Sequence, residues 1–129
     1  MSELKKLSFD ERKKQSDKIL NKYEDKCPIY LSFDSNITLN VKEEKDKRNL
    51  NKYIVTTNLT LGQFLTIVRK KINFTSMESL TLFIEEYKND KLKSTILATN
   101  SSTIGELYNK NKDQDGFLYL KAVKENVFG

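Results

Sequence analysis

The sequence predicts an α+β fold in which a four-stranded mixed sheet packs over one central amphipathic helix. Two observations predict this fold. Four short segments are rich in aromatic and branched residues and are bounded by polar stretches, as strands are. Between the second and the third of them lies a capped segment whose apolar residues recur at helical spacing. With 129 residues, of which 37% are hydrophobic, the chain has the size and composition of one globular domain.

Capping residues mark the starts of three helices. Ser8 precedes a charged segment with few apolar residues, which predicts a surface helix over residues 9–23. Thr60 begins a capping box, and the apolar residues after it recur at the spacing of a buried helical stripe. Thr103 precedes a short third helix, which we expect to end near residue 109. The predicted stripe of the central helix consists of Leu61, Phe64, Leu65, Val68 and Ile72.

The strands are expected on either side of the central helix. Pro28 is expected to start the first strand, because proline cannot donate to a strand ladder. The stretches 34–51 and 88–102 are polar and show no hydrophobic period, which predicts loops. Two strand pairs that flank a central helix give the β-grasp order of ubiquitin-like proteins, an order that does not by itself indicate a function. The predicted strands span residues 28–33, 52–56, 80–84 and 117–120.

Composition excludes several classes of function. One cysteine cannot form an intrachain disulfide, and the absence of histidine removes the usual catalytic base and metal ligand. Because Cys27 has no histidine to activate its thiol, we expect no enzyme activity, no catalytic residue, no metal and no cofactor. No apolar run is long enough for a membrane span or a secretory signal, which predicts a cytoplasmic protein.

The net charge of +5 is spread along the chain and is not concentrated in one segment. Short basic runs such as 12–14 and 69–71 are interleaved with acids, which is typical of a solvated face. A basic nucleic-acid-binding domain is the less favoured alternative, since it needs a clustered basic patch with aromatic stacking platforms. We therefore expect no nucleic-acid partner.

Several segments that lie in order along the chain carry a family resemblance. They read FDER at 9–12, KYEDKCPI at 22–29, KYIV at 52–55, LTLGQF at 59–64, IGELY at 104–108, DQDGFLY at 113–119 and ENVFG at 125–129. Together they resemble the autophagy-related protein 8 family of ubiquitin-like modifiers, which includes the GABA-receptor-associated proteins and the light chains of microtubule-associated proteins. The N-terminal helix favours this family over ubiquitin itself, which begins directly with a strand.

The resemblance implies that the carboxylate of Gly129 is the reactive group. An activating enzyme would adenylate it, a conjugating enzyme would carry it as a thioester, and it would finally be joined to the amine of phosphatidylethanolamine. A processing and delipidating cysteine protease is a further implied partner. Each buried CH₂ of an acyl chain contributes about 0.8 kcal/mol, so the lipid would hold a cytoplasmic protein on the autophagosome membrane. A sister modifier that is joined to a protein lysine is the alternative.

The resemblance also implies a docking surface for cargo receptors. An extended peptide with an aromatic residue, two arbitrary residues and an aliphatic residue would add a strand along residues 52–56. The implied aromatic pocket consists of Ile19, Pro28, Tyr30, Lys52, Ile54 and Phe117. The implied aliphatic pocket consists of Tyr53, Val55, Leu59, Phe64, Ile67 and Val68. The implied basic contacts to acidic residues of the peptide are Lys26, Lys52 and Arg69.

The chain is expected to have three parts: an N-terminal helical extension over 1–26, a ubiquitin-like domain over 27–123 and a flexible conjugation tail over 124–129. The pocket residues Phe64 and Val68 also belong to the predicted core stripe, so core packing and ligand contact are both open for them.

Overall fold

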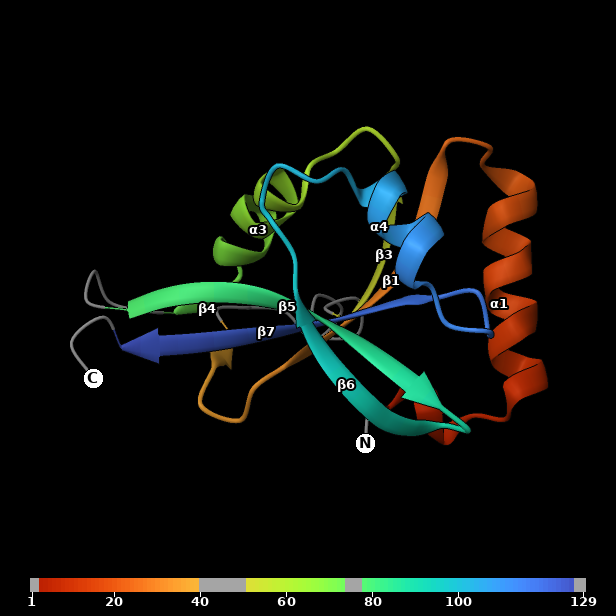
Figure 1. Ribbon diagram of the computed structural model, residues 1–129, viewed down its shortest axis with the longest axis horizontal. Helices are drawn as coiled ribbons and strands as arrows, with labels where there is room; N and C mark the ends of the chain where they lie inside the picture. The colour runs from red at the N-terminus through yellow and green to blue at the C-terminus, as the bar shows by residue number, and fades with distance from the viewer. Residues whose placement is uncertain (1–2, 40–50, 74–77, 127–129) are drawn as a thin grey trace.

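The computed structural model describes residues 3–39, 51–73 and 78–126. The fold is α+β as predicted: most strands form one mixed sheet, and α3 covers one of its faces (Figure 1). The elements in chain order are η1 (Leu4–Lys6), α1 (Phe9–Lys22), β1 (Lys26–Phe33), β2 (Thr38–Leu39), β3 (Lys52–Thr56), α3 (Leu61–Arg69), β4 (Ile72–Asn73), β5 (Glu78–Lys88), β6 (Lys91–Leu97), α4 (Ile104–Asn111) and β7 (Leu118–Asn126).

The main sheet has five strands in the order β3-β1-β7-β5-β6. β1 runs parallel to β7 and antiparallel to β3, while β5 pairs antiparallel with both β7 and β6. The first and last strands of the chain therefore lie side by side, and β3 and β6 form the two edges (Figure 1). The short strands β2 and β4 form a separate two-stranded sheet.

The main core lies between α3 and the sheet. α3 begins at the predicted capping box, in which the side chains of Thr60 and Gln63 each accept a hydrogen bond from the other's backbone N–H. The predicted stripe is buried at three of its positions on α3. Ile72 is also buried, but it lies in β4, because α3 has already ended. Core residues of α3 and the sheet include Leu61, Phe64, Val68, Ile29, Leu31, Leu82, Ile84, Leu118 and Leu120.

The opposite face of the sheet carries a second apolar cluster. Side chains alternate along β1 and β7, so that Leu31 and Leu120 join the main core while Tyr30 and Tyr119 belong to the second cluster. Leu4 of η1 packs into this second cluster and is only 1% exposed. The turn η1 therefore lies against the face of the sheet that α3 does not cover.

The prediction of a loop over residues 88–102 is wrong for β6, which spans Lys91–Leu97 and pairs with β5. The chain reverses through Asn89 and Asp90, whose φ angles are 52° and 61°. Two successive left-handed residues form a tight hairpin turn that matches the twist of the flanking strands. β6 lacks a clear apolar pattern because it is an edge strand, where polar side chains are tolerated on both faces. The sheet therefore has five strands where four were predicted.

Pro28 is the third residue of β1 and not its first, contrary to the prediction. Hydrogen-bonded pairs along the β1–β3 ladder include Leu31 with Asn51, and such pairs alternate with pairs that lack ladder bonds. By this alternation Pro28 faces Ile54 in a pair without ladder bonds. Pairing with β7 starts only at Ile29. The missing N–H of proline therefore removes no bond from either ladder.

Two short elements, β2 and η1, lie outside the helices and strands that the sequence predicted. The predicted loop 34–51 holds β2, which pairs with β4, while residues 40–50 of this segment lie outside the described residues. The segment before α1, which belongs to the predicted helical extension 1–26, contains the 3₁₀ turn η1.

The C-terminal strand runs further than predicted. β7 continues to Asn126, which pairs with Glu78 of β5. The first three residues of the segment 124–129 are therefore part of the sheet. Residues 127–129, with Gly129 among them, lie outside the described residues.

Candidate functional site

β3 forms an exposed edge of the sheet. Among the described residues it pairs with β1 alone, so the backbone groups along its other side have no strand partner there. Lys52, Ile54 and Thr56 are exposed, whereas Val55 is buried and Tyr53 is half-buried. An edge of this kind can accept an extended peptide as an added strand.

The residues assigned to the aliphatic pocket lie on β3, on α3 and in the connection between them. The ring of Tyr53 packs edge-to-face on the ring of Phe64, with 5.1 Å between the centroids. Phe64 and Val68 are buried in the main core, and Leu59 is half-buried. Ile67 is 41% exposed, one helical turn after Phe64. The structure thus joins Tyr53 to the core through Phe64 and leaves Ile67 as an apolar surface residue.

Lys71, which the sequence did not single out, fixes the position of Tyr53. Its ammonium lies 4.6 Å from the centroid of the tyrosine ring and donates a 3.2 Å hydrogen bond to the hydroxyl group. Burial raises the pKa of Tyr53 to about 12, so the phenol is protonated at neutral pH.

The residues assigned to the aromatic pocket divide into buried and exposed members. Tyr30 and Phe117 are 3% and 1% exposed and belong to the second apolar cluster. Pro28 is buried as well, and Ile19 of α1 is half-buried. Ile54 is 46% exposed and is the most exposed apolar member of this set.

The three basic residues occupy different environments. The ammonium of Lys52 donates a 3.0 Å hydrogen bond to Oε1 of Gln15 on α1, and this bond links β3 to the helix. The ammonium of Lys26 lies 5.1 Å from the ring centroid of Tyr23. Arg69 is exposed at the end of α3.

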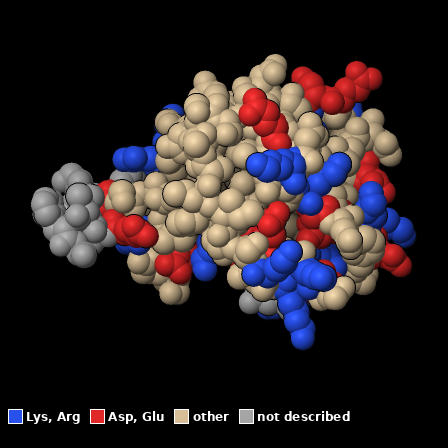
Figure 2. Space-filling model, viewed as in Figure 1, with Lys and Arg blue, Asp and Glu red and all other residues tan. Residues whose placement is uncertain are grey.

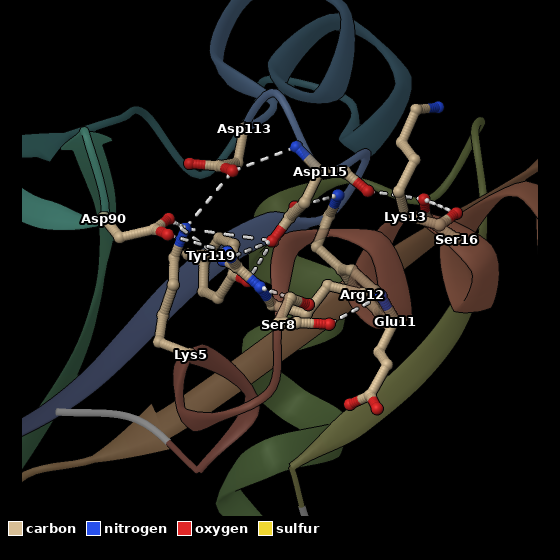
Figure 3. Close-up of polar contacts among 11 residues, drawn as sticks. Lys5, Ser8, Glu11, Arg12, Lys13, Ser16, Asp90, Asp113, Asp115 and Tyr119 are labelled. Atoms are coloured by element: carbon tan, nitrogen blue, oxygen red, sulfur yellow. Dashed lines mark hydrogen bonds and ion pairs between the residues drawn. The ribbon is translucent and has the colours of Figure 1, made fainter.

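A network of charged side chains joins the N-terminal segment to the C-terminal half of the chain (Figure 3). Arg12 is 0% exposed, and its guanidinium contacts Asp90 at 2.8 Å and Asp115 at 3.1 Å. Lys5 forms ion pairs with Asp90 at 3.1 Å and with Asp113 at 3.2 Å. The assignment of the whole basic run 12–14 to a solvated face is therefore wrong for Arg12. Its carboxylate partners come from distant segments, so no local pattern marks it.

Two carboxyl groups of this network titrate differently. Hydrogen bonds from Arg12 hold the pKa of Asp90 below its ordinary value, and Lys5 adds to this effect. Burial raises the pKa of Asp115, although the hydroxyl of Tyr119 donates a hydrogen bond to its carboxylate. Half of the Asp90 side chain is exposed, whereas that of Asp115 is fully enclosed.

The turn before β7 places the carboxylates of Asp113 and Asp115. Gly116 has a φ of 92°, and a Cβ at this position would collide with the side chain of Ser16. The Ser16 hydroxyl donates to the backbone carbonyl of Asp115 at 2.5 Å, and the Tyr108 hydroxyl donates to that of Gly116 at 2.6 Å. The close contact of the segment DQDG at 113–116 with α1 is a feature that the sequence did not reveal.

Two further features concern thiol chemistry and membrane spans: the environment of Cys27 and the character of the helices. Cys27 is buried, and burial raises the pKa of its thiol to about 11, so it offers no thiolate at neutral pH. None of the helices in the described part of the chain has the length and apolar character needed to cross a membrane.

Comparison with known proteins decides the family. The sequence model of the family described as "Autophagy protein Atg8 ubiquitin like" matches residues 11–129. The chain belongs to the Atg8 family. An Autophagy-related protein 8 from Schizosaccharomyces pombe is 32% identical over 128 residues, which cover 95% of this chain and 89% of that protein. An Autophagy-related protein 8 from Mycosarcoma maydis is 30% identical over 122 residues, which cover 95% of this chain and 91% of that protein.

Solved Atg8 structures share the fold of this Atg8-family chain. The crystal structure of Trypanosoma brucei ATG8 has a TM-score of 0.65 and 28% identity, and the match covers 95% of this chain and 93% of that one. A structure of Plasmodium falciparum Atg8 in complex with a Plasmodium falciparum Atg3 peptide has a TM-score of 0.69 and 23% identity, with 95% of each chain covered. These matches confirm the ubiquitin-like α+β fold with a helix before the β-grasp core.

Proposed function

We propose that this Atg8-family chain is a ubiquitin-like modifier that is joined through the carboxyl group of Gly129 to phosphatidylethanolamine. The observation that carries the proposal is the family match, which extends to residue 129. Glycine suits the step because, without a Cβ, it can enter a narrow enzyme site and adopt any backbone angle there. The protein is then the substrate of the conjugation chemistry and not its catalyst, and the cytoplasmic form becomes bound to the autophagosome membrane.

The proposal assigns a role to each of three parts of the chain. The extension 1–26 packs on the sheet through Leu4 of η1. The domain 27–123 presents the docking edge, and the segment 124–129 is the conjugation tail. The partners are an activating enzyme, a conjugating enzyme and a processing cysteine protease. The Plasmodium falciparum Atg8 structure contains an Atg3 peptide. This complex supports the proposal that the present chain binds a peptide of its conjugating enzyme.

The free edge of β3 supports a second role as an adaptor for cargo receptors. An aromatic-x-x-aliphatic peptide that adds a strand there would meet Ile54 on β3 and Ile67 on α3, which are 46% and 41% exposed. Lys26, Lys52 and Arg69 would meet acidic residues of the peptide. Exposed ion pairs contribute about 0–1 kcal/mol each, so the apolar contacts supply most of the affinity.

The charge distribution gives no support to a nucleic-acid-binding function. On the face seen in Figure 2, lysine and arginine side chains are interspersed with aspartate and glutamate side chains. A surface that binds nucleic acid through its phosphates needs a continuous positive patch.

Reconstitution with phosphatidylethanolamine liposomes tests the proposal. The full-length chain is incubated with ATP and with the activating and conjugating enzymes, and the intact mass of the product is measured. We expect the mass to increase by one phospholipid, less one water, and the Gly129→Ala variant to gain less product under the same conditions. A mass that stays unchanged with liposomes but increases when a protein acceptor is supplied would assign the chain to the sister class of modifiers.

A further inference from the structure

The ammonium group of Lys5 is enclosed although it belongs to a 3₁₀ turn at the start of the described chain. The Lys5 side chain has 0% relative exposure. Its Nζ lies 3.1 Å from Asp90, 3.2 Å from Asp113 and 3.8 Å from Asp115, measured to a carboxylate oxygen in each case. The ring centroids of Tyr87 and Tyr119 lie 4.5 Å and 4.6 Å from the same atom.

These five side chains form what we call the ammonium site: Tyr87, Asp90, Asp113, Asp115 and Tyr119. Carboxylates neutralise an ammonium and accept its hydrogen bonds, and aromatic faces attract the same charge through their quadrupole. The carboxylates lie in the β5–β6 turn and the α4–β7 connection, and Tyr119 lies on β7 (Figure 3). Tyr87 lies on β5. None of these five residues lies in the N-terminal segment that contains Lys5.

The site is held in shape by contacts that do not involve Lys5. One oxygen of Asp115 accepts the backbone N–H of Phe117 at 2.9 Å, and the other accepts the hydroxyl of Tyr119. Asp113 accepts the backbone N–H of Asp115 at 3.0 Å. Arg12 of α1 binds Asp90 and Asp115 from one side. The site is therefore preorganised for a cation before η1 arrives.

η1 binds the rest of the molecule through a few side chains, as a peptide ligand would, and a short segment connects it to α1. Two adjacent side chains anchor it: Lys5 in the ammonium site and Leu4, 1% exposed, against Tyr30, Phe117 and Tyr119. The backbone hydrogen bonds from Lys6 and Leu7 stay within the turn. An aliphatic residue followed by lysine thus supplies the main side-chain contacts of the turn.

Solvent reaches two of the three carboxylates, Asp90 and Asp113, from outside. A cleft of about 410 Å³ is lined by Tyr87, Asp90 and Asp113, together with Phe9 of α1. Half of the Asp90 side chain is exposed. A second cation can therefore approach the site without unfolding the sheet.

We propose that the ammonium site binds a primary ammonium on an unbranched alkyl chain, and that Lys5 is its intramolecular occupant. When η1 detaches from the sheet, a lysine side chain of a partner protein competes with Lys5 for the site. In the partner, as in this chain at Leu4, an aliphatic residue precedes the lysine. A tethered group acts at an effective concentration in the millimolar range, so a free amine binds well only when Lys5 is absent.

The test removes the Lys5 ammonium by mutation and offers n-butylammonium as a replacement ligand. The Lys5→Ala variant lacks the occupant, and Lys6→Ala is the matched control, because the neighbouring Lys6 side chain is 59% exposed. We expect Lys5→Ala to melt several degrees lower than Lys6→Ala. Added n-butylammonium should raise the melting temperature of Lys5→Ala by about 2 °C, relative to tetramethylammonium at equal ionic strength, and leave wild type and Lys6→Ala unchanged. Equal shifts in all three proteins, or no shift in Lys5→Ala, would overturn the proposal.

A second measurement uses variants that keep Lys5, in case Lys5→Ala does not fold. Amine acylation of the intact protein is followed by fragmentation mass spectrometry, which reads Lys5 and Lys6 separately. In wild type, Lys5 should react about tenfold more slowly than Lys6 or slower still, because acylation requires local opening of η1. Asp90→Asn, at a half-exposed position, should speed the acylation of Lys5 severalfold without changing Lys6. Equal reactivity of the two lysines in wild type, or a Lys5 that is unaffected by Asp90→Asn, would contradict the site.

Discussion

Arg12 stands first in a run of three cations, and it alone of the three is buried. Its guanidinium is placed between Asp90 and Asp115, while Lys13 and Lys14 are half-exposed or exposed. Three adjacent residues of similar charge thus have different energetic roles, because a helix turns about 100° per residue and points each side chain in a different direction. Charge in the sequence alone does not distinguish them.

Replacing Arg12 with methionine removes the cation closest to the enclosed carboxylate of Asp115. Breaking a buried pair by removing one partner costs about 3–5 kcal/mol, so we expect urea unfolding to show a loss of this size. Lys14→Met is the matched control on the same helix, and it should change the free energy of unfolding by less than about 0.5 kcal/mol. Equal unfolding midpoints for the two variants would show that the network does not stabilise the fold.

Asp90 makes part of the stability dependent on pH. Its pKa is lowered in the folded protein, chiefly by hydrogen bonds from Arg12, so it stabilises the fold above its ordinary pKa of 3.8. That contribution is lost as the pH falls below 3.8 and passes through the folded-state pKa. We expect Asp90→Asn to be less stable than wild type at pH 7, by about 1 kcal/mol, and the two proteins to converge at strongly acidic pH. A difference that stays constant over this range in urea titrations would contradict the assignment.

The helices could be predicted from the sequence because their starts carry local chemistry. Ser8, Thr60 and Thr103 each accept a hydrogen bond from a backbone N–H three residues later, as their positions before the helices predicted. β6 could not be predicted, because an exposed edge strand has no apolar alternation and its turn, Asn89–Asp90, lacks the glycine that usually marks a hairpin. The candidate docking residues could be named only through the family resemblance.

Substitutions beside the β3 edge and on the opposite edge strand β6 test where an extended peptide binds. We expect Ile54→Asp and Ile67→Asp each to weaken an aromatic-x-x-aliphatic peptide at least about tenfold, which corresponds to about 1.4 kcal/mol, because a carboxylate would replace an exposed apolar contact. Leu97→Asp is the control on the opposite edge strand, where the side chain is 66% exposed. Titration calorimetry with one peptide compares all three variants. Loss of binding in Leu97→Asp alone would place the docking surface on β6.

At the scale of the whole molecule, the parallel pair β1–β7 brings the first and last strands of the chain together. The N-terminal segment then packs on one face of the sheet through Leu4, and α3 packs on the other. This arrangement leaves β3 open at one edge and carries β7 out to Asn126, three residues before Gly129. The proposed function requires a folded body with an open strand edge for peptides and a terminal segment that enzymes can reach.

The proposed function requires the covalent bond to the lipid to form at the carboxyl group of Gly129. Fragmentation mass spectrometry of the intact liposome-bound product tests it most directly, because the fragments locate the added mass along the chain. We predict that every fragment containing Gly129 carries the mass of phosphatidylethanolamine less one water, and that no fragment lacking it does. Added mass on a lysine-containing fragment that excludes Gly129 would contradict conjugation through the C-terminal carboxyl group.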